Sequence, residues 1–210
     1  MTNTKERILA TALHLFARDG YEAVSVSDIA GELGMTKGAL YKHYRNKRAI
    51  FDSIVAQMIQ LDRQRAQEYA VPEAPYETAA EAYRQTEPES VREYSVAQYH
   101  FWTSDAFASD FRKMLALEQY RSPEMNALYQ SCLVSGPVGY LEDLFRTMME
   151  NKRLRDGDPR QLAIEFFAPL FLLIQMSDGG KNENAEARLS GFADEFFRKY
   201  AEKEEYENGD

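Results

Sequence analysis

A lysine, a glycine and a tyrosine lie close together in a segment whose side chains could contact nucleic-acid bases. Lys37 and Tyr41 are four positions apart, so on a helix they share one face. Gly38 lies beside them without a side chain, which permits close approach to bases or backbone. A lysine can donate to guanine O6 and N7, and a tyrosine can touch a thymine methyl group and donate a hydrogen bond. This face therefore has groups suited to reading base edges.

Several residues around this face suit phosphate groups. Lys42 and His43 flank it, and Lys47 begins the next predicted helix, where free backbone N–H groups and the helix dipole favour an anion. Ser25 and Thr36 are predicted N-caps, whose hydroxyls can face phosphate oxygens. The candidate phosphate contacts are Ser25, Thr36, Lys42, His43 and Lys47. The alternatives are an ordinary lysine-bearing surface helix, a packing role for Tyr41 and a simple surface histidine at His43.

Two short predicted helices, 26–33 and 37–44, carry these residues. Ser25 and Asp28 form a capping pair at the first helix, Gly34 is its natural stop, and Thr36 caps the second. Two short helices at this spacing match a helix-turn-helix, in which the first helix braces across the backbone. The second projects into a groove about 12 Å wide. Predicted helices at 3–18 and 47–69 flank the pair.

The distribution of charge supports contact between this segment and an anion. The 210-residue chain has a net charge of −9, but residues 1–50 hold eight basic and five acidic residues, a net charge of +3. The remaining residues hold 17 basic and 29 acidic residues, a net charge of −12. Such asymmetry predicts a head that meets an anion and a body that does not.

The body also follows a helical pattern, with predicted helices at 88–104, 107–121, 123–153, 158–178 and 185–204. Residues 76–87 are either a short helix or a linker, and Gly136-Pro137 is expected to bend or split the helix at 123–153. A single cysteine, Cys132, excludes an internal disulfide and favours a reducing cytoplasm. The mainly apolar run 162–176 is shorter than the roughly 20 residues that span a bilayer, and the first residues lack a signal peptide pattern. We therefore expect a cytoplasmic protein without a membrane partner.

The sequence carries no strong sign of catalysis. It has no Gly-x-Ser-x-Gly elbow, P-loop, His-Glu-x-x-His or paired-cysteine metal motif. Its three histidines, His14, His43 and His100, are far apart, which weakens a metal site. We expect no catalytic residues, no metal and no cofactor. The alternatives to a DNA-binding protein are an enzyme, or a helical ligand-binding or partner-binding protein, with the head as a scaffold only.

The stretch from Arg7 to Phe51 resembles the TetR family of repressors. The match comprises Ile8-Leu9, Ala12, Leu15-Phe16, Gly20-Tyr21, Val26-x-Asp28-Ile29-Ala30, the run from Gly34 to Tyr44, Lys47 and Phe51. The resemblance implies an all-α fold of about nine helices and a homodimer. It also implies base contacts from Lys37, Gly38 and Tyr41, and phosphate contacts from the five residues named above. The expected domains are a DNA-binding head at 1–50 and a ligand-binding and dimerisation body at 51–210, into which helix 47–69 continues.

Two helices of the body are expected to form the dimer interface. The helix at 158–178 is apolar nearly all round, so it must be covered on several sides, by the body and by a partner subunit. The family resemblance pairs it with the last helix in a four-helix bundle across a twofold axis. The predicted interface residues are Phe166, Leu170, Leu173, Ile174, Leu189, Phe192 and Phe196. Plain intramolecular core is the alternative.

An aromatic region of the body, 94–145, is the expected ligand site, because family members hold a ligand near these helices and the fourth helix. The candidate contacts are Tyr94, Gln98, Trp102, Tyr120 and Tyr140, although an ordinary core role is the alternative for each. The predicted function is a sequence-specific transcriptional repressor that an unidentified small molecule releases from its duplex DNA operator.

Overall fold

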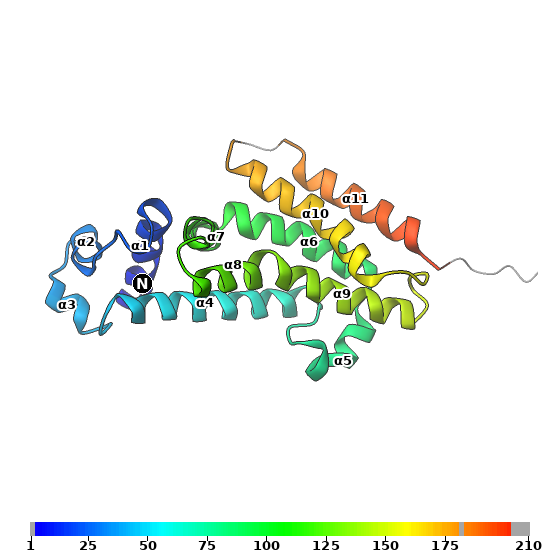
Figure 1. Ribbon diagram of the computed structural model, residues 1–210, viewed down its shortest axis with the longest axis horizontal. Coiled ribbons are helices and arrows are strands. Elements are labelled where there is room, and N and C mark those ends of the chain that lie inside the picture. Colours follow the sequence, from blue (N-terminus) through cyan, green and yellow to red (C-terminus); the bar gives the residue numbers. More distant parts are fainter. Residues whose placement is uncertain (1–2, 181–182, 203–210) are drawn as a thin grey trace, which may run out of the picture. The chain divides into compact units, whose positions relative to one another are not determined.

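The computed structural model of the protein describes residues 3–180 and 183–202. Within these ranges the regular structure is helical, apart from a single bridge between Leu154 and Ala201. The predicted all-α fold is confirmed. The helices are α1 (Thr4–Asp19), α2 (Val26–Glu32), α3 (Lys37–Tyr41), α4 (Lys47–Glu68), α5 (Tyr76–Gln85), α6 (Pro88–Ser104), α7 (Ala106–Glu118), α8 (Pro123–Leu133), α9 (Ser135–Glu150), α10 (Pro159–Ser177) and α11 (Ala185–Tyr200) (Figure 1).

The structure divides the predicted helix at 123–153 into α8 and α9. The break falls at Val134, whose φ of −131° and ψ of −86° are not helical. Pro137 lies in the first turn of α9, where its missing N–H costs no helical hydrogen bond. Residues 76–85 form α5, which decides between the helix and the linker that the sequence left open. Residues 203 and 204 of the predicted last helix lie outside the described residues.

Side-chain caps set the starts of the first three helices. Asn3 forms a capping box with Glu6 at α1, and Ser25 forms one with Asp28 at α2. The Thr36 side chain accepts a hydrogen bond from the Ala39 N–H at the start of α3. Because each cap bonds an N–H that lacks an intrahelical partner, these starts follow from the local sequence.

Contacts between Cα atoms divide the chain into two compact units. The first unit comprises residues up to 64 and 101–134, which hold α1 to α3, most of α4, the end of α6, α7 and α8. Its core includes fully buried side chains from α1, α2, α3 and α4: Ile8, Phe16, Ile29, Leu40 and Ile54. Helix α7 packs across α1, as Figure 1 shows with α7 seen end-on.

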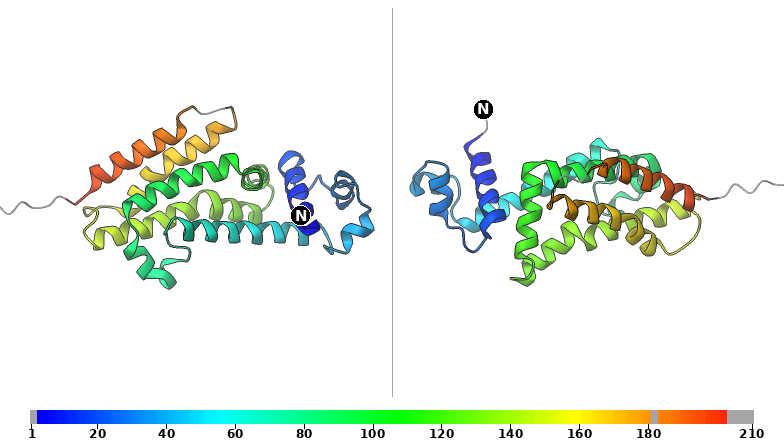
Figure 2. Two further views of the ribbon diagram at one scale, coloured as in Figure 1. Left: turned by 180° about the vertical axis from the view of Figure 1, so that it is seen from behind. Right: turned by 90° about the horizontal axis from the view of Figure 1, so that it is seen from above.

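The second unit comprises 65–100 and the residues from 135 onwards, which hold α5, most of α6, α9, α10 and α11. Helices α10 and α11 run side by side in both views of Figure 2. Rings of Phe145, Phe166 and Phe196 meet in the core, with centroids 4.9–5.5 Å apart. This division by contacts does not test the expected division of function between 1–50 and 51–210, which stays a prediction.

None of the helices in the described ranges is both long enough and apolar enough to cross a membrane.

Candidate nucleic-acid interface

A tight turn joins α2 to α3. Gly34 has a φ of +64°, the left-handed conformation that glycine adopts without strain. The Met35 N–H donates to the Ala30 carbonyl at 2.9 Å, and the Gly34 N–H donates to the Gly31 carbonyl at 3.0 Å. These two hydrogen bonds form a Schellman motif, which ends α2 and sends the chain at once into the Thr36 cap of α3. The predicted helix-turn-helix geometry is present.

The two faces of α3 differ in the way that the sequence predicts. Leu40 is fully buried in the core of the first unit. Lys37, Gly38 and Tyr41 are exposed, Tyr41 by 44%, and the Lys37 Nζ lies 5.9 Å from the centre of the Tyr41 ring. No described atom beyond its own helix and chain neighbours lies within 4 Å of a Cβ built on Gly38. The predicted base-reading residues therefore share one open surface.

The predicted phosphate contacts divide into exposed and half-buried residues. Ser25, Thr36 and Lys42 are exposed, and His43 and Lys47 are half-buried. The hydroxyl oxygens of Ser25 and Thr36 accept capping hydrogen bonds, and a hydroxyl that accepts a hydrogen bond can still donate its own proton to a phosphate oxygen. Contact with phosphate remains a prediction for all five residues.

Lys47 has a structural partner that the sequence analysis missed. Its Nζ donates to the Tyr21 carbonyl at 2.7 Å and to the Glu22 carbonyl at 3.3 Å. The same ammonium lies 4.3 Å from the centre of the Tyr21 ring. Lys47 therefore ties the start of α4 to the connection between α1 and α2. Because 26 residues separate Lys47 from Tyr21, no local pattern indicated the contact.

Arg48 also forms hydrogen bonds within the first unit. Its guanidinium donates to Asp52 one turn along α4 and to both carboxylate oxygens of Glu124 on α8. The Arg48 hydrogen bonds hold the pKa of Glu124 below its ordinary value. Arg48 thus joins α4 to α8.

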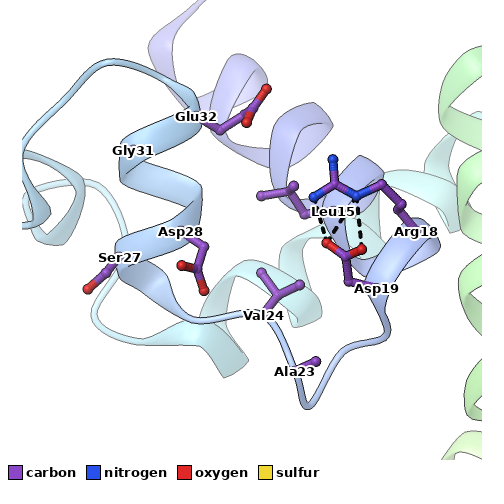
Figure 3. A pocket seen from close by; sticks show the side chains of 9 residues that line it. All are labelled: Leu15, Arg18, Asp19, Ala23, Val24, Ser27, Asp28, Gly31 and Glu32. Atoms are coloured by element: carbon purple, nitrogen blue, oxygen red, sulfur yellow. Dashed lines mark hydrogen bonds and ion pairs between the residues drawn. The ribbon is translucent and has the colours of Figure 1, made fainter.

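A hollow between α1 and α2 has the wrong charge for a polyanion. It has a volume of about 600 Å³, and Figure 3 shows Asp19, Asp28 and Glu32 around the apolar side chains of Leu15 and Val24. Hydrogen bonds from Arg18 hold the pKa of Asp19 below its ordinary value, and hydrogen bonds from Ser25 do the same for Asp28. These carboxylates would repel phosphates, so the hollow is not where we expect DNA.

The structure does not bring the five candidate ligand residues together in one unit. Trp102 and Tyr120 belong to the first unit, and Tyr94, Gln98 and Tyr140 belong to the second. Tyr120 is 87% exposed, because α7 ends at Glu118 and leaves Tyr120 in the turn that follows. The single chain therefore does not enclose the Tyr120 side chain, and contact between Tyr120 and a ligand stays a prediction.

Two of the ligand candidates in the second unit pack on other aromatic rings. The Tyr140 ring lies 5.7 Å from that of Tyr83, and the Tyr94 ring lies 5.9 Å from that of Tyr69. The Gln98 Oε1 is buried and has no hydrogen-bond partner among the described residues. Gln98 is therefore the candidate whose polar group is available for a ligand.

Most of the predicted dimer residues lie in the chain's own core. Phe166, Leu170, Ile174, Leu189 and Phe196 are at most 8% exposed. The intramolecular alternative that the sequence left open therefore describes these five residues. Leu173 and Phe192 are half-buried. The outer face of α10 instead exposes large apolar side chains that were not predicted as contacts: Ile164 at 45%, Leu172 at 58% and Met176 at 53%.

Comparison with known proteins finds relatives of the helix-turn-helix segment and of the whole fold. Residues 8–54 match the bacterial regulatory proteins of the tetR family. The HTH-type transcriptional regulator YerO of Bacillus subtilis is 44% identical over 50 residues, which are 24% of this chain and 17% of YerO. The first curated relatives are thus matched over less than a third of their own length.

Two solved structures match nearly the whole chain in fold. PfmR, a TetR-family regulator of Thermus thermophilus, has a TM-score of 0.64 and 23% identity, over 94% of this chain and 97% of PfmR. SmeT, the repressor of a Stenotrophomonas maltophilia multidrug efflux pump, has in its triclosan complex a TM-score of 0.66 and 17% identity, over 96% and 93% of the chains. The protein thus has a helix-turn-helix domain on an all-helical body. Residues 8–54 are thus similar to the bacterial regulatory proteins of the tetR family, and the whole chain has the fold of TetR-family regulators.

Proposed function

We propose that the protein is a sequence-specific transcriptional repressor that binds duplex operator DNA as a homodimer and is released by a small molecule. The observation that carries this proposal is the open face of α3. Lys37, Gly38 and Tyr41 lie together on it, while Leu40 on the other side anchors the helix in the core. A buried side and a base-reading side on one short helix after a tight turn are the requirements for entry into a major groove.

Operator binding is tested by selection from a pool of random duplexes, followed by fluorescence anisotropy on the selected sequence. We expect a roughly palindromic site with half-sites about 34 Å apart, because each α3 reads only a few base pairs. The selected duplex should bind at least about 10³-fold more tightly than a scrambled duplex of the same composition at the same salt. Equal affinity for the two duplexes would refute sequence-specific recognition.

The dimer that we propose uses the exposed face of α10, with α11 beside it, as a four-helix bundle about a twofold axis. Ile164, Leu172 and Met176 recur at helical spacing along α10 and are each about half exposed in the single chain. A row of large apolar side chains on one helix face is characteristic of a protein–protein contact. The proposal thus moves the contact from buried Phe166 and Phe196 to residues that a partner can reach.

The ligand that we propose is small and largely apolar, with a polar group that contacts Gln98. The ring of Tyr94 lies near this residue, since Tyr94 is one helical turn before Gln98 on α6. The buried Oε1 of Gln98 would gain a hydrogen bond from a ligand donor. The ligand-bound solved structure of SmeT with triclosan supports a ligand role for a body of this fold.

A further inference from the structure

Helix α7 carries a buried charge that the proposed function does not use. Glu118 in the last turn of α7 is only 1% exposed. Its Oε1 accepts a hydrogen bond from the Tyr21 backbone N–H at 3.0 Å and lies 3.5 Å from the Arg121 Nε. Glutamate is rarely buried completely unless it is paired, and the partners of this carboxylate are the Tyr21 N–H and Arg121.

Tyr21 is the point where three helices hold the connection between α1 and α2. Its N–H is bound by Glu118 of α7, and its carbonyl is bound by Lys47 of α4. Its ring packs edge-on against Phe16 of α1 and Phe51 of α4, with centroids 5.1 Å apart in both pairs. Since α2 begins only five residues later, the position of Tyr21 constrains the position of α2.

Gly20 shows how closely the carboxylate approaches the backbone. A Cβ built on Gly20 would lie 3.0 Å from the Glu118 Oε1, and the φ of Gly20 is +90°. A side chain here would meet both backbone strain and the carboxylate. The absence of a side chain at Gly20 therefore leaves room for the carboxylate of Glu118, which lies 98 positions further along the chain.

We propose that Glu118 is a positioning residue for DNA recognition: through its hydrogen bond to the Tyr21 N–H, α7 sets the position from which the helix-turn-helix presents α3. This inference rests on the proposed function. Glu118 does not contact DNA itself. Loss of its acceptor would leave α2 and α3 folded but free to shift against α7, which would affect base contacts more than contacts to phosphate.

The test compares three substitutions in the full-length protein. Glu118→Gln keeps an acceptor oxygen for the Tyr21 N–H, Glu118→Asp draws the carboxylate back by one methylene, and Glu118→Met fills the space without an acceptor. For the aspartate and methionine variants we expect operator affinity to fall at least about tenfold, with affinity for scrambled duplex within about twofold. The glutamine variant should stay within about threefold of the wild type on both duplexes.

Asp110→Asn is the matched control. It removes the charge from a polar contact between α1 and α7, the 3.0 Å pair of Asp110 with His14, without touching Tyr21. This variant should bind the operator like the wild type. All variants are compared below their melting temperatures. If Glu118→Met does not fold, Glu118→Asp, which retains the charge, tests the loss of the hydrogen bond by itself.

Amide hydrogen exchange at Tyr21 separates this inference from the proposed function, because it needs no DNA. Exchange should accelerate in Glu118→Met and Glu118→Asp and remain slow in Glu118→Gln. Exchange that follows this pattern in a protein that binds no operator would refute only the proposed function. Folded Glu118→Asp with wild-type operator affinity, or with equal losses on operator and scrambled duplex, would overturn the positioning role.

Discussion

At the scale of single residues, Lys37 and Tyr41 are the side chains on which sequence preference should depend. Both are exposed on α3, so their removal leaves the core intact. We expect Lys37→Ala or Tyr41→Ala to cost on the order of 1–3 kcal/mol of operator binding and to relax the preferred bases. Anisotropy titrations against single-base operator variants measure this change. If both variants kept the base preference of the wild type, Lys37 and Tyr41 would not read the operator bases.

Lys47 should behave differently from Lys42, although both are predicted phosphate contacts. Lys42→Ala removes an exposed cation, so we expect the slope of log affinity against log salt to fall by about one unit, with an unchanged melting temperature. Lys47→Ala also removes the hydrogen bond to the Tyr21 carbonyl, so it should lower the free energy of unfolding by about 1–3 kcal/mol. Thermal denaturation and salt titrations of both variants supply the comparison. Identical melting temperatures would mean that Lys47 does not hold the connection between α1 and α2.

At the scale of the helices, α10 has a core face and an exposed apolar face. We expect a charge on the exposed face to prevent dimerisation and a charge on the core face to prevent folding. Leu172→Glu places a charge on the exposed face, so we expect folded monomers in sedimentation experiments. Phe166→Glu buries a carboxylate among Phe145 and Phe196, which costs several kcal/mol without a partner and should unfold the second unit.

Ala82→Glu supplies a control for the charge itself. It adds a carboxylate at an exposed position of α5, a helix outside the proposed interface, and should leave the dimer intact. Dimers that persist in Leu172→Glu at micromolar concentration would place the contact on another face.

At the scale of the whole molecule, release by a ligand requires that ligand and operator weaken each other equally. Binding free energies are linked, so a ligand that lowers operator affinity about 5–150-fold must itself bind that much more weakly when operator is present. We expect this reciprocity for apolar aromatic compounds that raise the melting temperature of the free protein. Calorimetric titration with and without operator measures it, and equal ligand affinities in both titrations would exclude an inducer.

Gln98→Leu tests the ligand contact within the same experiment. We expect weaker ligand binding with unchanged operator affinity, because Gln98 belongs to the second unit and the base-reading residues belong to the first. Unchanged ligand affinity would move the contact away from Gln98.

The sequence by itself determined the local structure of the head. Caps, turn glycines and apolar periodicity act between residues a few positions apart, so Ser25 with Asp28, Gly34 and Thr36 predicted where α2 and α3 begin and end. The same local pattern placed Lys37 and Tyr41 on one face and Leu40 on the other. Most helices of the body were predicted for the same reason.

Only the tertiary structure decided which partner each long-range group has. Lys47 bonds a carbonyl 26 residues away, Glu118 bonds an N–H 97 residues away, and neither pairing has a local signature. Tertiary packing also decided which apolar residues of α10 face inward, because a helix that is apolar nearly all round offers several equivalent faces to the core. Phe166 is buried and Leu172 is exposed. Which of the two is buried depends on how α9 and α11 pack against α10 rather than on the sequence of α10 itself.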